Sequence, residues 1–279
     1  MAVAVTLPPC FFCGDSAREV VWTYDAAPVG ETRFPLPEGA AYARQIMRCD
    51  GCGHFQSLTD MDLSGLYSEA YVNATYADSA GMRAQFERIT SLPPERSDNR
   101  ARVRRVTDFA ARALPADLPR TLLDVGSGLA VFPWAMAREG WDVTAVDPDP
   151  RAVEHARQVA CVAAVCGDFF TLALPRRHGV VTLNKVLEHV ADPVAMLVRT
   201  LPVLAAGGIV YVEVPDGEAA RADGFGREEF FVEHLHVFSS RSLDELASRA
   251  GLDVLRAEQL REPSGKYTLA AFLRSREAA

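Results

Sequence analysis

The chain has 279 residues, of which 49% are hydrophobic, and it carries a formal net charge of -8 at pH 7. This composition excludes global disorder, because it supplies enough apolar surface for a sizeable core. The acidic balance disfavours a nucleic-acid partner, since following a phosphate backbone requires a basic surface. The N-terminal residues lack the regions of a signal peptide, and no run approaches the roughly 18 apolar residues of a membrane span. We therefore expect a cytoplasmic protein with no membrane partner.

Two Cys-x-x-Cys pairs lie in the N-terminal part of the chain, Cys10 with Cys13 and Cys49 with Cys52. A two-residue spacing lets both sulfurs of a pair face one ion, and two such pairs complete a tetrahedral thiolate site for zinc. Glycines that suit such turns lie beside the pairs: Gly14, Gly51 and Gly53. A short segment buries little apolar surface, so the metal would supply folding free energy. The alternatives are reduced structural thiols or a redox dithiol, and we expect His54 at the surface or beside the metal ligands.

From about residue 120, short apolar runs alternate with helical segments. The expected strands are 121–126, 142–147, 162–166, 180–183, 209–214, 252–257 and 267–273. The expected helices are 130–139, 151–158, 193 to about 207, and 242–250. This alternation predicts an α/β fold with a parallel sheet, helices on both faces and ligands at the carboxyl edge of the strands.

A glycine-containing turn, Gly126-Ser127-Gly128, follows the first of these strands and opens a helix. Glycines let the backbone approach a ligand closely at the positive end of the helix dipole. The third glycine of a dinucleotide fingerprint is absent, since Val131 occupies its position. The turn therefore predicts a cofactor site but disfavours a nicotinamide-dependent reductase.

Acidic residues mark the ends of three successive strands. Asp124 precedes the glycine turn, Asp147 ends the second strand and is followed by Pro148, and Asp168-Phe169 follows the third. An acid at the end of the second strand can accept hydrogen bonds from both ribose hydroxyls. The third acid can accept from an adenine amino group while the phenylalanine packs on the ring. These residues join the predicted cofactor site.

At this point the sequence resembles class I S-adenosylmethionine-dependent methyltransferases. Their D-x-G-x-G signature corresponds to residues 124–128, and their fourth motif to residues 184–190. The resemblance implies a Rossmann-like, seven-stranded sheet, S-adenosylmethionine as cofactor, and a cofactor-facing pair in Asn184 and Lys185. Glu188 and His189 follow that pair, and they either contact the substrate or cap and pack the next helix.

A closer resemblance is to a subgroup that joins a zinc ribbon to this fold and includes sugar C-methyltransferases of deoxysugar pathways. It is carried by residues 53–56, by a tyrosine-rich linker and by residues 230–239. The tyrosines, which either line the substrate entrance or anchor the linker, are Tyr67, Tyr71 and Tyr76. The implied organisation is a zinc-binding module in 1–57, a helical linker or cap in 58–115 and the methyltransferase domain in 116–279.

Methyl transfer to a hydroxyl or a carbon acid requires a base that removes a proton as the new bond forms. His234 is the leading candidate, because a neutral imidazole is available near pH 7, and the resemblance implies the same residue. His236 is the second candidate. The alternative for either is a histidine that packs a loop over the sheet. The sugar enzymes carry an assisting tyrosine where this chain has Phe231, which cannot transfer a proton, so O-methylation stays open beside C-methylation.

The expected amphipathic helix 99–114 carries several arginines: Arg100, Arg102, Arg104, Arg105 and Arg112. A solvated face is the simpler interpretation, and a phosphate site for a nucleotide-linked substrate is the alternative.

The leading functional hypothesis is methyl transfer to a small molecule, namely a sugar, a nucleotide sugar or a natural-product intermediate. Two alternatives stay open. One is an RNA methyltransferase that grips RNA with its zinc module, and the other is a non-catalytic binding protein on the same fold. The sequence gives no indication of the oligomeric state.

Overall fold

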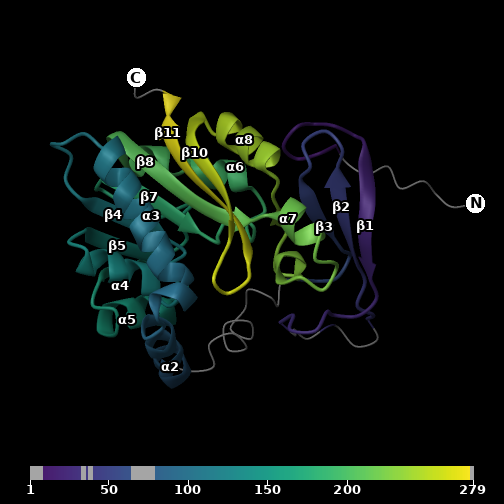
Figure 1. The fold of residues 1–279 in the computed structure, drawn as a ribbon, viewed down its shortest axis with the longest axis horizontal. Coiled ribbons are helices and arrows are strands. Elements are labelled where there is room, and N and C mark those ends of the chain that lie inside the picture. Colours follow the sequence, from purple (N-terminus) through teal and green to yellow (C-terminus); the bar gives the residue numbers. More distant parts are fainter. Residues whose placement is uncertain (1–8, 33–35, 37–39, 64–78, 277–279) are drawn as a thin grey trace, which may run out of the picture.

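Two β-sheets of different size organise the protein (Figure 1). A computed structural model describes residues 9–32, 36, 40–63 and 79–276. The strands of the larger sheet are teal, green and yellow in Figure 1, and the N-terminal strands of the smaller sheet lie beside them in purple and blue. Among the described residues, no helix combines the length and the apolar character that crossing a membrane requires.

The larger sheet has seven strands in the order β10-β11-β8-β7-β4-β5-β6. They are β4 (Thr121–Val125), β5 (Asp142–Asp147), β6 (Ala163–Cys166), β7 (His178–Asn184), β8 (Leu204–Pro215), β10 (Leu252–Arg261) and β11 (Tyr267–Ser275). The strands from β6 to β8 are parallel, whereas β11 is antiparallel to both β8 and β10. The predicted Rossmann-like seven-stranded fold is confirmed. The expectation of parallel pairing is wrong for the last two strands, because their short connection permits only antiparallel pairing.

Helices cover both faces of this sheet. The helical elements among the described residues are, in chain order, α2 (Ser79–Thr90), η2 (Pro94–Arg96), α3 (Asp98–Ala113), α4 (Val131–Arg138), α5 (Pro150–Gln158), α6 (Pro193–Val198), η3 (Leu201–Val203), α7 (Gly217–Arg221), η4 (Glu228–Phe230) and α8 (Ser240–Arg249). Successive strand residues point to opposite faces, so Leu122 of β4 packs in one core with α3 and α4, while Leu123 packs in the other with α6 and α8. Apolar side chains on both faces explain why the strands read as continuous hydrophobic runs.

The helix expected from residue 193 to about 207 is shorter in the structure. α6 ends at Val198, and β8 already begins at Leu204. Pro202 has no N–H to donate to a continuing helix and ends it. Gly207, with φ 73, lies where the pairing of β7 with β8 shifts register, as expected for a glycine at a β-bulge.

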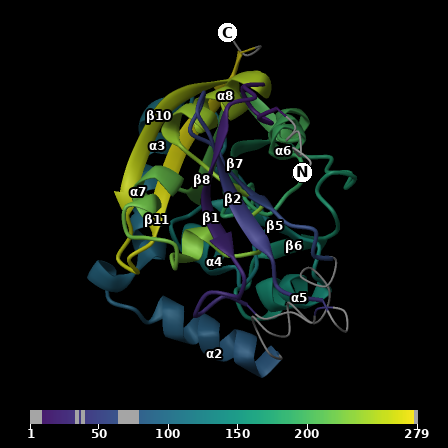
Figure 2. The same cartoon turned by 90° about the vertical axis from the view of Figure 1, so that its right-hand side faces the viewer.

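The smaller sheet joins the N-terminal part of the chain to a segment of its C-terminal half. It consists of β1 (Arg18–Tyr24), β2 (Arg44–Cys49), β3 (Phe55–Leu58) and β9 (His236–Val237), all antiparallel to their neighbours. β9 comes from the C-terminal half of the chain and pairs with β3. Figure 2 shows β1 and β2 from the side of this sheet. The N-terminal strands are thus hydrogen-bonded to the segment that carries both candidate histidines.

Candidate functional site

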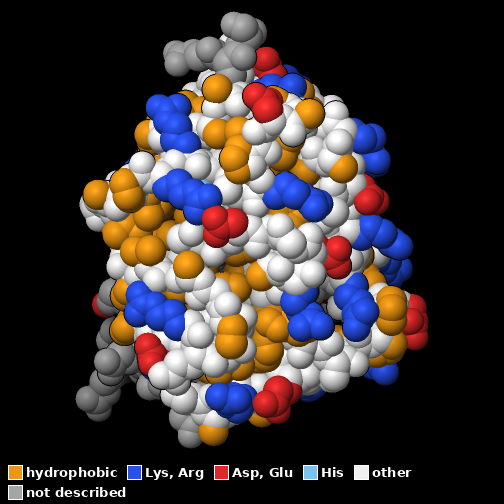
Figure 3. Space-filling model, turned by 90° about the vertical axis from the view of Figure 1, so that its left-hand side faces the viewer, with side chains coloured by type: hydrophobic (Ala, Val, Ile, Leu, Met, Phe, Trp, Pro, Cys, Tyr) orange, Lys and Arg blue, Asp and Glu red, His pale blue; other side chains and the backbone are white. Residues whose placement is uncertain are grey.

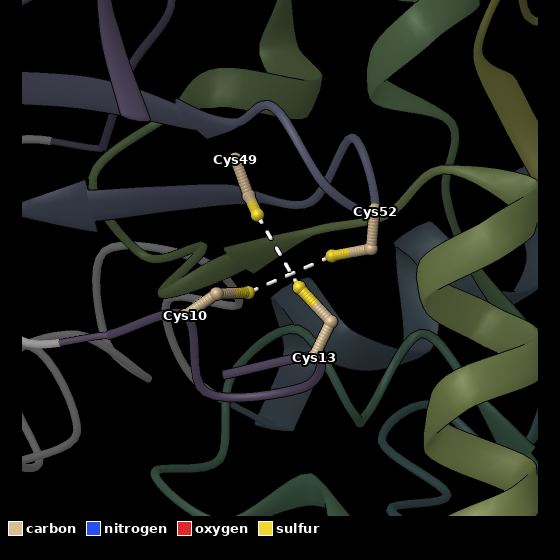
Figure 4. A group of neighbouring side chains, drawn as sticks. All are labelled: Cys10, Cys13, Cys49 and Cys52. Atoms are coloured by element: carbon tan, nitrogen blue, oxygen red, sulfur yellow. Dashed lines mark hydrogen bonds between the residues drawn. The ribbon is translucent and has the colours of Figure 1, made fainter. Parts of the chain in front are cut away.

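The four N-terminal cysteines converge on one point (Figure 4). The Sγ atoms of Cys10 and Cys52 are 3.6 Å apart, those of Cys13 and Cys49 are 3.4 Å apart, and all four lie within 4.8 Å of one another. Sulfurs about 2.3 Å from a tetrahedral zinc ion lie roughly 3.8 Å from each other, whereas a disulfide requires about 2.05 Å. All four cysteines are free. The donor set and its spacing therefore fit a structural zinc ion.

Glycines shape the two cysteine turns in different ways. The amide of Gly14 donates to the Cys10 carbonyl and that of Gly53 to the Cys49 carbonyl, and these glycines have φ values of 74 and 71. Only glycine adopts this left-handed backbone without strain. Gly51 instead allows a close approach, because a Cβ there would lie 2.5 Å from Asp15 Oδ2.

His54, just before β3, and His236 of β9 form a buried pair. Nε2 of His54 is 3.0 Å from Nδ1 of His236, and the two residues are 2% and 3% exposed. The ring of Phe12 packs edge-to-face on His54. Burial lowers the pKa of His54 well below its ordinary value and that of His236 to about 4. His54 is thus buried rather than at the surface, and the candidate base His236 packs against it.

The glycine turn between β4 and α4 has the conformation that a close ligand requires. Gly126 and Gly128 have φ values of 71 and 50. A Cβ on Gly126 would lie 2.6 Å from Cγ2 of Val186, so no larger residue fits without movement. Ala130, the N-cap of α4, also has a left-handed φ of 53, which costs about 1 kcal/mol outside glycine. The predicted loop is therefore formed, with local strain at its end.

Asp124 connects this turn to β7. Its Oδ1 accepts hydrogen bonds from Thr182 Oγ1 at 2.5 Å and from Asn184 Nδ2 at 2.8 Å. Burial raises the pKa of Asp124 to about 6, although these hydrogen bonds act in the opposite direction. The structure thus brings Asp124 and Asn184 together, whereas the Nζ atom of Lys185 donates to Thr268 on β11 at 2.7 Å.

Asp147 lies at the end of β5, beside the glycine turn. Its two carboxylate oxygens accept one backbone N–H each, from Gly128 at 2.8 Å and from Asp149 at 2.9 Å. Each carboxylate oxygen accepts a second hydrogen bond readily, so acceptor capacity remains for a ligand. Burial raises the pKa of Asp147. Pro148 is exposed next to it, before Asp149 caps α5.

Asp168 and Phe169 follow β6 but face different surroundings. Asp168 is exposed, and its Oδ1 accepts a hydrogen bond from the amide of Phe170. Phe169 is only 3% exposed and belongs to the core, with the guanidinium of Arg199 5.2 Å from its ring centre. The ring expected to pack on adenine is therefore buried, because it fills the core, and the exposed ring beside Asp168 is that of Phe170, at 38%.

Glu188, His189 and His234 come together from two distant segments. One side-chain ligand atom of each lies within 4.8 Å of the others, and the two imidazole rings meet at 4.9 Å between centroids. Nδ1 of His234 is 2.8 Å from the Glu229 carbonyl oxygen. Burial lowers the pKa of His234 well below its ordinary value and raises that of Glu188. The candidate base is thus a neutral imidazole that lies beside a buried carboxyl group.

The segment that carries His234 is anchored by a buried ion pair that the sequence did not reveal. Arg44 and Glu31 form a 2.9 Å ion pair with both side chains 0% exposed. Arg44 also donates to the Phe230 carbonyl at 2.6 Å, and Glu31 accepts from the Val232 amide at 2.7 Å. No local pattern marks these residues, since they meet only through tertiary structure. The smaller sheet thereby fixes the backbone just before His234.

Two arginines of α3 are not part of a solvated face. Arg102 and Arg105 bind the carboxylate of Glu213, which is 0% exposed, at 2.6 and 2.9 Å. The hydroxyl of Tyr211 donates to the same carboxylate. Burial alone would raise the pKa of Glu213, but the charge and hydrogen bonds of Arg102 lower it to about 2. This cluster ties α3 to β8.

A cavity of about 610 Å³ lies between α3 and α4, lined among others by Asn99, Arg104 and Trp134. Arg100 and Arg104, two of the arginines considered for a phosphate site, line it, whereas none of the predicted catalytic, cofactor or metal residues does. Figure 3 shows a face of the molecule on which Lys and Arg side chains are separated by apolar, neutral and acidic groups. That face offers no continuous basic surface for a nucleic acid.

Three of the predicted substrate residues, Tyr67, Tyr71 and Tyr76, lie outside the described residues. Their contribution to the site stays a prediction.

Curated relatives match part of the chain. The ubiquinone biosynthesis O-methyltransferase of Serratia proteamaculans is 33% identical over 99 residues, covering 33% of this chain and 41% of that protein. The enzyme of the same name from Xanthomonas campestris pv. campestris is 34% identical over 116 residues, covering 39% and 47%. The matches thus span less than half the length of these relatives.

Solved structures share the fold at low identity. DesVI of Streptomyces venezuelae aligns with a TM-score of 0.51 and 19% identity, over 70% of this chain and 98% of that one. The O-methyltransferase NcsB1 from neocarzinostatin biosynthesis, in complex with S-adenosyl-L-homocysteine and 1,4-dihydroxy-2-naphthoic acid, aligns with a TM-score of 0.51 and 22% identity, over 75% and 62%.

The family model described as a methyltransferase domain matches residues 96–257, more than half of the chain. The match includes α3, the strands β4 to β8 and most of β10. It begins before residue 116, because α3 packs into the same core as β4 and β8. The chain belongs to this methyltransferase family.

Proposed function

We propose that the protein transfers a methyl group from S-adenosylmethionine to a small-molecule acceptor. The observation that carries this proposal is the carboxyl edge of the sheet. There the glycine turn after β4 meets Asp147 of β5 and the Asp124–Asn184 pair of β4 and β7. Membership of the methyltransferase family supports it. The bound cofactor supplies an electrophilic methyl group, so the protein's main task is to align it with the acceptor.

In this proposal different residues bind different parts of the cofactor. The free acceptor positions of Asp147 receive the ribose hydroxyls, with Pro148 beside them. Gly126, Ser127 and Gly128 let the backbone approach the cofactor's amino-acid part, near the carboxylate of Asp124. The full set of proposed cofactor residues is Asp124, Gly126, Ser127, Gly128, Asp147, Pro148, Asp168, Phe169, Asn184 and Lys185. Within this set Phe169 supports the adenine side from the core.

On the acceptor side, His234 is the proposed base. Its Nδ1 is held by the Glu229 carbonyl, so Nε2 carries the lone pair of the neutral ring and receives the acceptor's proton. Glu188 and His189, whose ligand atoms lie within 4.8 Å of that of His234, are proposed to contact the same acceptor. His236 keeps a packing role, because its ring contacts His54. Tyr67, Tyr71 and Tyr76 are proposed to line the entrance.

The four cysteines are proposed to hold zinc, and the zinc-binding module, 1–57, to position His234. The module is connected to the His234 segment by the β3–β9 pairing and by the Arg44–Glu31 pair. The linker 58–115 and the methyltransferase domain 116–279 complete the proposed organisation. Zinc here is structural, because four thiolates leave no open coordination position for a substrate.

The proposed acceptors are sugars, nucleotide sugars and hydroxylated natural-product intermediates. Phe231 has no group that exchanges a proton, so His234 alone would deprotonate the acceptor, which favours an acidic hydroxyl over a carbon acid.

The test is to incubate the zinc-loaded protein with S-adenosylmethionine and a panel of nucleotide sugars and phenolic acceptors, and to measure S-adenosylhomocysteine release. We expect acceptor-dependent release that His234→Gln lowers by about 10²-fold or more, while His178→Gln, a histidine at the start of β7, leaves it nearly unchanged. Release that His234→Gln does not alter would remove His234 from the mechanism. A folded protein that binds the cofactor but releases no product with any acceptor would favour the non-catalytic alternative.

A further inference from the structure

The cluster of Glu188, His189 and His234 contains a buried carboxyl group that no other described residue hydrogen-bonds. Glu188 is 1% exposed, and neither of its carboxylate oxygens has a hydrogen-bond partner within the described part of the chain. Burying an unpaired carboxyl group costs several kcal/mol unless a proton or a cation compensates it. The ligand atoms of both histidines lie within 4.8 Å of this carboxylate.

Both histidines have the same ring nitrogen, Nδ1, next to a backbone carbonyl oxygen. Nδ1 of His234 is 2.8 Å from the Glu229 carbonyl oxygen, and Nδ1 of His189 is 2.9 Å from the Glu233 carbonyl oxygen. A carbonyl oxygen only accepts, so Nδ1 donates in each ring, and the lone pair of the neutral ring lies on Nε2. Histidines that bind metals are typically fixed in this way, with one nitrogen on a backbone carbonyl and the other on the metal.

We propose that Glu188, His189 and His234 bind a divalent transition-metal ion, at a site separate from the four cysteines. Two imidazoles and one carboxylate suit Zn²⁺, Co²⁺, Mn²⁺ or Fe²⁺, whereas Mg²⁺ and Ca²⁺ prefer oxygen ligands. Ligand atoms about 2.1 Å from a metal lie roughly 3.0–3.4 Å apart. Small side-chain rotations bring groups within 4.8 Å to that spacing.

The ligands come from two segments with backbone support on each side. Glu188 and His189 follow β7, and the Glu188 carbonyl accepts hydrogen bonds from the amides of Leu235 and His236. These bonds connect the segment after β7 to the segment that carries His234. A metal ion would therefore cross-link two segments whose backbones are already hydrogen-bonded to each other. This arrangement limits the conformational entropy lost when the ion binds.

One consequence rests on the proposed function. Nε2 of His234 is both the proposed base and a proposed metal ligand, so a metal ion and the acceptor's proton compete for one lone pair. We expect methyl transfer to slow as this site fills with metal. The metal-binding test below does not depend on activity, so a failed methyl-transfer assay leaves it intact.

The test is a titration of the full-length, zinc-loaded protein with Co²⁺, followed by calorimetry and visible absorption. We expect one additional ion per chain, with the ligand-field bands of nitrogen and oxygen ligands and without the sulfur-to-cobalt charge-transfer band that the cysteine site would give. Glu188→Gln and His234→Gln should each weaken binding at least tenfold. Glu233→Gln, which changes the carboxyl group next to His234 but outside the cluster, should bind like the wild type. Near-ultraviolet circular dichroism checks that each variant is folded.

Three results would overturn the proposal. The first is that the folded wild type takes up no additional ion. The second is that bound cobalt shows only the sulfur-to-cobalt charge-transfer band of the cysteine site. The third is binding that Glu188→Gln and His234→Gln both leave unchanged, which would place the ion elsewhere on the protein.

Discussion

The Arg44–Glu31 pair offers a direct test of how the smaller sheet holds the His234 segment. Replacing Arg44 with methionine removes the partner of a carboxylate whose side chain is 0% exposed. Breaking a buried pair from one side costs about 3–5 kcal/mol, because the remaining charge stays buried and unpaired. The Phe230 carbonyl also loses its donor at 2.6 Å, which alone costs about 1–3 kcal/mol. These costs overlap, and we expect Arg44→Met to lower the free energy of unfolding by about 4 kcal/mol.

Urea denaturation of the zinc-loaded protein at pH 7, followed by circular dichroism, measures this change through the midpoint at constant slope. Arg48→Met is the matched control on the same strand, β2. Its ion pair with Glu218 is 2.6 Å long, but the side chains are 23% and 36% exposed, so we expect a loss of at most about 1 kcal/mol.

A double-mutant cycle isolates the pairwise contribution. Adding Glu31→Gln to Arg44→Met removes the buried carboxylate that has lost its partner. We expect the free energy of unfolding of the double variant to be about 2 kcal/mol higher than the sum of the two single changes predicts. Turnover in Arg44→Met should fall more than cofactor affinity, because the perturbed segment carries His234 and not the cofactor residues. Strict additivity, or a loss from Arg44→Met no larger than that from Arg48→Met, would refute the anchoring role.

Three further predictions follow from other parts of the structure. Removing zinc with a chelator should unfold the smaller sheet, because the metal supplies its folding free energy. The backbone amides of residues 44–58 should then lose their protection from hydrogen exchange, and unchanged protection would contradict this prediction. Gly126→Ala should weaken S-adenosylmethionine binding, measured by calorimetry, at least tenfold, since the new Cβ would lie 2.6 Å from Val186 at a φ of 71. Wild-type affinity in this variant would show that the glycine turn does not contact the cofactor. Burial raises the pKa of Glu213, but Arg102 lowers it overall to about 2, below the ordinary 4.5, so its contribution is full above pH 4.5 and is lost as the pH falls toward 2. The stability difference between wild type and Glu213→Gln should therefore narrow by about 2 kcal/mol between pH 6 and pH 3, and a constant difference would exclude this carboxylate.

Features encoded by local spacing were predictable from the sequence. The cysteine cluster follows from two C-x-x-C pairs, because each pair forms a turn that needs no distant partner. The glycine turn and Asp147 follow from strand ends, since parallel strands bring their carboxyl ends to one edge of the sheet. The seven strands were also detectable, because each is a short apolar run between turn residues.

Features that depend on tertiary contacts were not predictable. Arg44 and Glu31 are 13 residues apart, and only the folded sheet buries them together against Phe230. The sequence predicts that Arg102 and Arg105 are solvated helix residues, and only the structure shows their ion pairs with the buried Glu213. Phe169 and Phe170 are adjacent aromatic residues, and the sequence does not indicate which of them fills the core. The antiparallel β11 follows from its hairpin with β10, which periodicity alone does not reveal.

The carboxyl edge of the larger sheet is the proposed binding site of S-adenosylmethionine. It is tested most directly by calorimetric titration of the zinc-loaded protein with S-adenosylmethionine and S-adenosylhomocysteine. We expect micromolar binding that Asp147→Ala weakens at least tenfold, about 1.4 kcal/mol. Asp142→Ala, at the opposite end of the same strand, should bind like the wild type. Absence of binding to the folded wild type, or binding that Asp147→Ala leaves unchanged, would exclude this edge of the sheet as the cofactor site.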